Sequence, residues 1–328
     1  MHERRLLVWL VLLLVPALLL HLASGPNGPA PLLSLFDKDH DRLARLILVE
    51  IRLPRALLAL LVGGALGSAG AALQGFLRNP LAEPGVIGVS ASASLGAVAV
   101  LYFGAMGSPG LSLPFAAMGG ALATTALLVA LVRAGAGTLV LILAGVGINA
   151  LAAAATALLL DLSPNPFALA DMVSWLMGSF ENRSLADVRL AAPFVIVGLG
   201  LLLATGRGLS ALTLGEETAR SLGVRVERLG IMVIMGAGIA VGGAVAVSGA
   251  IGFVGLVVPH ILRPFVDHAP ERLLRPSALG GALLLLVADA LTRIMPTAQP
   301  LNIGVVTAFV GAPVFLNLIW RANRWRAA

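Results

Sequence analysis

The chain has 328 residues, of which 59% are apolar and 12% charged, and its mean hydropathy is +0.98. A soluble domain carries about 25% charged residues, whereas this chain has several nearly uncharged stretches long enough to cross a bilayer. The absence of cysteine excludes disulfides, thiolate catalysis, Cys-ligated zinc and a lipoprotein anchor. The composition predicts an all-α polytopic membrane protein, and the net charge of +6 comes without the basic, aromatic-rich soluble region that nucleic-acid binding would need.

Residues 1–25 have a charged start, an apolar centre and small residues at the end, as secretory signal peptides do. We expect a retained first span instead, because many further apolar stretches follow. About ten spans are predicted, at residues 5–22, 54–77, 86–103, 112–132, 138–161, 190–207, 229–247, 250–263, 277–295 and 303–320. The stretch 167–180 is too short to cross and is expected to lie at the surface.

The distribution of basic residues predicts which side of the membrane each loop faces. An even number of spans places both termini on one side. With the termini inside, the inner segments hold most of the 22 lysine and arginine residues, as the positive-inside rule requires. Both termini, and the polar stretch at 208–228, are therefore expected in the cytoplasm.

Three arginines stand out on the predicted outer side. Arg52 and Arg55 flank the start of the second span, and Arg293 lies at the outer end of the ninth. One interpretation is that they anchor helix ends at the lipid headgroups. The other is that they form a basic docking face for an acidic extracellular partner, because arginine binds carboxylates through two parallel hydrogen bonds.

Small and polar residues predict how the spans pack. Small residues recur every four positions in the second span, at Gly63, Gly67, Ala71 and Gly75. They form a smooth face that another helix can approach closely. A few polar side chains are predicted at membrane depth, at Gln74, Asn149 and Asp289. Such groups usually face the interior of a helix bundle or a water-filled path.

Two segments rich in glycine and proline interrupt the spans, NPLAEPGVIGVS at 79–90 and SGAIGFVGLVVPH at 248–260. Irregular backbone at membrane depth is tolerated only where protein or a water-filled cavity surrounds it, which indicates a packed transport core. Without gaps, 64–80 also aligns weakly with 243–259. Since the second span runs inward and the seventh outward, this similarity is consistent with an inverted repeat of five spans.

The sequence carries no recognisable catalytic or metal-binding constellation. It has no phosphate-binding G-x-x-x-x-G-K-[ST] loop, nucleophile elbow or H-E-x-x-H motif, and His260 has no second ligand at helical spacing. An intramembrane enzyme would need paired catalytic groups at depth. An ion-coupled transporter would need buried ion ligands, for which Asp289 is the candidate. Both remain alternatives to the interpretation that follows.

The stretch SALTLGEETARSLGVRVER at 210–228 is unusually polar for this chain. Thr213 with Glu216 fits a capping box, acidic residues precede Arg220 as the helix dipole favours, and Gly223 suits the left-handed position after the last turn. The pattern predicts a short helix of about two turns. Such a helix could be an ordinary surface loop or an element that inserts into a cytoplasmic partner.

Several motifs resemble one family of bacterial ABC importer permeases. ETARSLG at 217–223 is similar to its coupling-helix pattern E-x-A-x-x-x-G. Nearly the whole chain is similar to the permeases for iron–siderophore, haem and vitamin B12 uptake, in these stretches: RLPR (52–55), RNPLAEPGVIGVS (78–90), LAGVGINA (143–150), WLMGSF (175–180), GAIGFVGLVVPHILR (249–263) and IGVVTAFVGAPVF (303–315).

The resemblance implies a single permease domain over 1–328 with an inverted-repeat fold and a coupling loop at 208–228. It implies a homodimer in the bacterial inner membrane, two cytoplasmic ATP-binding subunits that hold ATP and Mg²⁺, and a periplasmic substrate-binding protein. The permease itself is expected to bind no cofactor or metal and to have no ATPase site. Transport would proceed by alternating access, with a ferric siderophore ranked first as cargo, cobalamin second and haem third.

The resemblance also assigns roles to individual residues. Coupling to the ATPase falls to Thr213, Gly215, Glu216, Glu217, Ala219, Arg220 and Gly223. Docking of the binding protein falls to Arg52, Arg55 and Arg293. The gate and pathway fall to Thr138, Leu139 and Asn149. Leu139 departs from the vitamin B12 importers, which have a serine there, so a gate at this position would differ in polarity.

Overall fold

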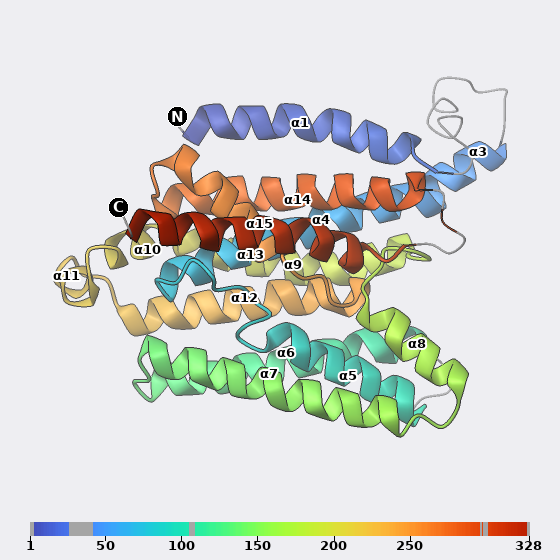
Figure 1. The fold of residues 1–328 in the computed structure, drawn as a ribbon, viewed down its shortest axis with the longest axis horizontal. Coiled ribbons are helices and arrows are strands. Elements are labelled where there is room, and N and C mark those ends of the chain that lie inside the picture. Colours follow the sequence, from blue (N-terminus) through green and yellow to red (C-terminus); the bar gives the residue numbers. More distant parts are fainter. Residues whose placement is uncertain (1–2, 26–41, 105–108, 296, 298–300, 327–328) are drawn as a thin grey trace.

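The computed structural model describes residues 3–25, 42–104, 109–295, 297 and 301–326. In these residues the regular structure is helical, and the long helices run side by side along one axis (Figure 1). The helices are α1 (Glu3–Ala23), α3 (Arg42–Leu46), the π-helical turn η1 (Ile47–Arg52), α4 (Leu53–Phe76), α5 (Val89–Phe103), α6 (Pro109–Arg133), α7 (Thr138–Asp161), α8 (Pro166–Leu176), α9 (Leu185–Ala204), α10 (Gly206–Leu212), α11 (Glu216–Ser221), α12 (Val226–Ser248), α13 (Val254–Leu262), the 3₁₀ turn η2 (Arg263–Val266), α14 (Pro270–Ile294) and α15 (Ile303–Arg326).

Every predicted span contains a helix, which confirms the polytopic all-α class. Seven helices of the described chain are long and apolar enough to cross a membrane, whereas α5, α13 and the apolar part of α15 are shorter. Helices α5 and α13 begin at Val89 and Val254, a few residues after the predicted starts at 86 and 250. Gly88 (φ 83°) is the N-cap residue of α5 and Gly249 (φ 70°) follows the end of α12, and both adopt the positive-φ backbone that glycine tolerates.

Helix α4 forms the centre of the bundle, and most of its length is buried. The predicted smooth face is confirmed at Gly63 and Gly67, where a Cβ atom would overlap the α14 backbone at Gly281 and Ser277. Gly70 meets the backbone of Gly255 at the start of α13 in the same way. These glycines let three helix backbones approach more closely than any side chain would permit.

The weak repeat does not hold residue by residue. The ungapped alignment pairs Gly70 with Gly249, but Gly70 lies inside α4 while Gly249 ends α12. The similarity is instead one of architecture. Helices α4 and α12 are both long and buried, and each is followed by a non-helical segment, 77–88 in one case and 249–253 in the other.

The two ends of the bundle differ in what they carry. The start of α1, the end of α15 and the short helix α11 lie at one end, and α3 and α8 lie at the other (Figure 1). The predicted surface stretch is the short helix α8, which the Asn165 side chain caps by accepting a hydrogen bond from the Ala168 N–H at 2.9 Å. Both termini therefore lie at the end that carries α11, as an even number of spans requires.

Candidate coupling site, gate and outer polar cluster

Helix α11 is shorter than expected, and its N-terminus differs from the predicted capping box. It spans six residues, and its N-cap is Gly215 (φ 101°), with no side chain capping the helix. Thr213 instead donates its hydroxyl to the Ser210 carbonyl at 2.7 Å. The capping-box prediction is wrong because α10 continues to Leu212, so Thr213 belongs to the end of that helix and glycine makes the turn into the next.

The C-terminus of α11 is a complete Schellman motif. Gly223 (φ 84°) donates its N–H to Arg220, and Val224 donates to the carbonyl of Ala219 at 3.0 Å. The predicted left-handed glycine is thus confirmed. Arg220 also pairs with Glu216 one turn earlier, at 2.9 Å. The short helix is therefore closed by its own backbone and presents fixed geometry to a partner.

One face of α11 is anchored and the rest is open. Ala219 is fully buried, whereas Glu216, Glu217 and Arg220 are exposed. Two large apolar side chains flank the helix in the open, Leu214 at 63% and Leu222 at 62% exposure. The polar helix is therefore flanked by two exposed apolar side chains that another protein could cover.

Two recesses adjoin α11. A cavity of about 120 Å³ is lined from both sides by Glu216 and Arg220 of α11 and by Thr138 and Leu141 of α7. The predicted coupling helix and the predicted gate thus share one cavity.

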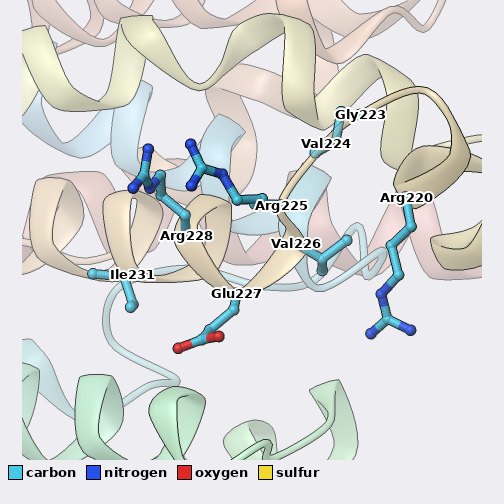
Figure 2. Close-up of a pocket in the computed structure, with 8 residues that line it drawn as sticks. All are labelled: Arg220, Gly223, Val224, Arg225, Val226, Glu227, Arg228 and Ile231. Carbon is cyan, nitrogen blue, oxygen red and sulfur yellow. The ribbon is translucent and has the colours of Figure 1, made fainter.

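A wider recess of about 790 Å³ lies over the turn into α12. There Arg225 and Arg228 project to one side, whereas Arg220 and Glu227 point elsewhere (Figure 2). From the sequence alone, Arg225 and Arg228 are recognised only as basic residues on the predicted inner side.

The predicted gate residues lie on α7 but not together. Thr138 and Leu139 begin the helix, and Leu139 is 69% exposed. Asn149 lies 11 residues further along, roughly 16 Å away at 1.5 Å per residue, and is half-buried. Four residues of α7 are buried within this chain, and the others are half-buried or exposed. The helix thus offers a long apolar face with one amide part-way along it.

At the opposite end, a buried polar cluster joins α1, α4 and α14. The Asp289 carboxylate, fully buried, accepts hydrogen bonds from Arg55 Nε at 2.7 Å and Nη2 at 2.9 Å. His21 Nε2 lies 2.8 Å from the same carboxylate. Arg293 Nε is 3.6 Å away. Asp289, predicted to face the interior or a path, therefore serves as the shared counter-ion of this cluster.

The arginines of the predicted outer side also cap the end of α1. Arg293 donates to the carbonyls of His21 at 2.7 Å and Ser24 at 3.0 Å, and Arg52 donates to the carbonyl of Leu22 at 2.6 Å. The last carbonyls of a helix lack partners within it, and cations favour that end of its dipole. Arg52, Arg55 and Arg293 are thus largely buried against their own chain. Sequence reasoning missed His21, whose position at the end of an apolar span was the available signal.

The Gln74 side chain bonds to neighbouring helices and does not line a transport path. Its side-chain amide donates to the carbonyl of Gly255 at 3.2 Å, and its carbonyl accepts from Arg263 of η2. Pro259 lies four residues after Gly255 and has no N–H, so it leaves that carbonyl without its helical donor. Gln74 supplies the missing donor across the α4–α13 interface.

Known proteins resemble this chain in both sequence and structure. The FecCD transport family model matches residues 10–321. The chain is 39% identical to the Fe(3+) dicitrate transport system permease protein FecD of Escherichia coli, over 96% of this chain and 98% of that protein. It is 37% identical to the vitamin B12 import system permease protein BtuC of Citrobacter koseri, over 98% and 97%. Among solved structures, an inward-facing metal-chelate type ABC transporter superposes with a TM-score of 0.87 at 32% identity, covering 97% of this chain and 99% of the other.

Proposed function

We propose that this chain, which belongs to the FecCD transport family, carries an iron chelate inward by alternating access. The members of this family are the membrane-spanning permeases of ABC importers, which work with ATP-binding subunits and a substrate-binding protein. The arrangement of α11 and α7 is the main support. Arg220 of the coupling helix and Thr138 at the start of α7 line the same cavity. A displacement of α11 by an ATP-binding subunit would therefore reach the gate directly.

The cargo is proposed as a ferric siderophore, with cobalamin second and haem third. One relative is named for iron dicitrate, another for vitamin B12, and the similar structure for a metal chelate. The long, exposed apolar face of α7 suits a large chelate that must pass without being held. ATP and Mg²⁺ are assigned to the partner subunits, and the permease is proposed to bind no cofactor or metal.

We assign the cytoplasm to the end that carries α11 and both termini, in a bacterial inner membrane. A second copy of this chain is the proposed neighbour along α7, where Leu139, Leu143 and Val146 are exposed. The path would then run between the copies, with Thr138, Leu139 and Asn149 facing it. A homodimer encloses this apolar face between the two copies, around the path, and leaves the remaining exposed helices to lipid.

Docking of the binding protein is proposed for the opposite end, over Arg52, Arg55 and Arg293. Arg55 and Arg293 share the carboxylate of Asp289, so these three side chains together carry one net positive charge. An acidic surface on the partner would balance it. The docking role therefore depends on the electrostatic field of these arginines as well as on the small part of their guanidinium groups that is exposed.

Uptake by the reconstituted transporter tests the function. The chain is placed in liposomes with its ATP-binding subunit and binding protein, and uptake of a ferric siderophore and of cobalamin is followed with and without ATP. ATP-dependent uptake of the siderophore alone supports the proposal. Uptake of cobalamin alone moves the cargo to the second candidate, and uptake independent of ATP contradicts the importer mechanism.

A neutralising substitution separates docking from folding. Arg52→Gln removes one positive charge from the proposed docking end, and its side-chain amide can still donate to the Leu22 carbonyl. If docking depends on that charge, the variant weakens binding-protein affinity while the permease stays folded, as judged by its melting temperature in detergent. Unchanged affinity would leave Arg52 with its structural role only.

A further inference from the structure

Helix α12 carries a stripe of exposed side chains on an otherwise buried surface. Arg228 is exposed, Met235 is 39% exposed, and Met232 and Ile239 are half-buried. These four residues follow one another at intervals of three or four, so they lie along one face of the helix. Arg225, just before the helix, is also exposed and projects to the same side as Arg228 (Figure 2). Together the five residues form the α12 stripe, which is basic at one end and apolar along the rest.

The α12 stripe ends part-way along the helix. Every residue from Ala240 to Ser248 is buried, so the exposed face stops at Ile239. From Arg228 to Ile239 the helix rises roughly 17 Å at 1.5 Å per residue. The hydrocarbon core of a bilayer is about 30 Å thick, and each leaflet contributes half of it. The apolar part of the stripe therefore spans about the depth of a single leaflet.

Two other spans pack beside the stripe without covering it. Leu202 of α9 meets α12 at Gly236, where a Cβ atom would lie 3.0 Å from the leucine Cδ2 atom. Thr125 of α6 meets α12 at Gly238. At 3.6 residues per turn, these two glycines fall on either side of the stripe. The stripe is therefore the open strip of α12 between α6 and α9, where the protein surface meets the membrane.

The two arginines of the stripe line the recess of about 790 Å³ over the turn into α12. In the part of the chain that the structure describes, neither Arg225 nor Arg228 forms an ion pair, whereas Arg220 on the same recess takes Glu216 at 2.9 Å. Glu227, the carboxylate nearest in sequence, points away from them (Figure 2). The recess therefore presents two positive charges that no group of this chain neutralises.

We propose that the α12 stripe binds an anionic phospholipid, whose phosphate lies on the two arginines and one of whose acyl chains lies along Met232, Met235 and Ile239. Arginine binds phosphate through parallel N–H···O hydrogen bonds, and methionine adapts its shape to an irregular apolar partner. An acidic protein would match the arginines alone, whereas a phospholipid matches both parts of the stripe. The inference requires only that the chain spans a membrane, and it is independent of the proposed cargo.

The test measures binding to the purified full-length permease in a neutral detergent by native mass spectrometry. Three probes separate charge from acyl chain: dioleoyl phosphatidylglycerol has both a net negative headgroup and chains, dioleoyl phosphatidylcholine has chains without net charge, and glycerol phosphate is the anion alone. We expect phosphatidylglycerol to bind most tightly. Equal binding of the two lipids would overturn the role of the arginines, and equally tight binding of glycerol phosphate would overturn the role of the apolar residues.

Arg225→Gln with Arg228→Gln should weaken the binding of phosphatidylglycerol roughly thirtyfold, the contribution expected of two basic residues at an anionic membrane surface. The melting temperature should not change, because both side chains are exposed. The matched control is Arg272→Gln with Arg275→Gln, which removes the same charge from the same end of the bundle. Each of these arginines is exposed and pairs with a carboxylate of its own chain. The control should bind phosphatidylglycerol as the wild type does.

The proposal is overturned if the variant at Arg225 and Arg228 binds phosphatidylglycerol as tightly as the wild type, or if the control loses as much affinity. Other occupants are recognised separately. In nanodiscs of phosphatidylcholine alone, the variant should bind the ATP-binding subunit normally, and a loss there would assign the arginines to that subunit. A change in the number of permease copies in the mass spectrum would assign the stripe to a second copy of the chain.

Discussion

Arg55 and Asp289, which are 234 residues apart in sequence, form a two-pronged buried ion pair with N–O distances of 2.7 and 2.9 Å. His21 completes the contact from α1. Three helices that meet at the end of the bundle opposite α11 are therefore held by one carboxylate. Arg55, predicted to bind a partner protein, therefore forms an ion pair within its own chain.

The first prediction concerns the loss of that carboxylate. Asp289→Asn would leave the Arg55 and Arg293 guanidinium groups buried without their counter-ion, which costs about 3–5 kcal/mol when one partner of a buried pair is removed. The melting temperature in detergent should fall clearly. The matched control is Asp267→Asn, whose partner Arg272 lies 3.4 Å away with both side chains more than half exposed. Exposed pairs are worth roughly 0–1 kcal/mol, so a comparable loss in the control would contradict the interpretation.

The second prediction concerns Gln74 and Pro259. Gln74→Leu should destabilise the protein by about 1–3 kcal/mol, because the Gly255 carbonyl then lacks a donor in the bundle interior. Adding Pro259→Ala restores a backbone N–H at the position that normally serves that carbonyl. The double variant should therefore regain stability relative to Gln74→Leu alone. A double-mutant cycle on melting curves measures this coupling, and strict additivity would show that the two residues act independently.

Helix packing provides the third prediction. Gly70→Ala would drive a methyl group into the backbone of Gly255, and overpacking of this kind costs about 1–3 kcal/mol. Gly119 of α6 is the control, because a Cβ atom there meets nothing within 4 Å. Gly119→Ala should be neutral or gain up to about 1 kcal/mol from helix propensity. Equal changes in stability at the two sites would mean that helix propensity, and not steric overlap with Gly255, determines the effect.

The sequence predicts the helices of this protein well and their polar partners poorly. Runs of apolar residues and the small face of α4 report burial directly, and ETARSLG carries both a local helix and a recognisable coupling motif. The roles of Asp289, His21 and Gln74 depend on which helices lie beside them. Their partners are up to 268 residues away, and no local pattern encodes that distance. The same applies to Thr213, whose place at the end of α10 follows from how far that helix continues.

The last prediction concerns the surface that α11 offers to the ATP-binding subunit. Leu214 and Leu222 are exposed on either side of a helix whose C-terminal end is closed by its own backbone. Leu214→Asp with Leu222→Asp should leave the melting temperature of the isolated permease unchanged, since neither side chain is buried in it. Association with the ATP-binding subunit should weaken at least tenfold, because about 1.4 kcal/mol is enough for that and each leucine can bury more against a partner.

Affinity for the ATP-binding subunit in detergent, with uptake in liposomes alongside, measures the effect of these changes. Ser221→Ala is the control, because Ser221 lies next to Leu222 and its hydroxyl donates to the Thr218 carbonyl of the same chain. The control should bind and transport as the wild type does. If the aspartate variant also binds normally, the contact must run through the charged residues of α11 or through Arg225 and Arg228 in the neighbouring recess, and the leucines would face lipid or solvent in the complex.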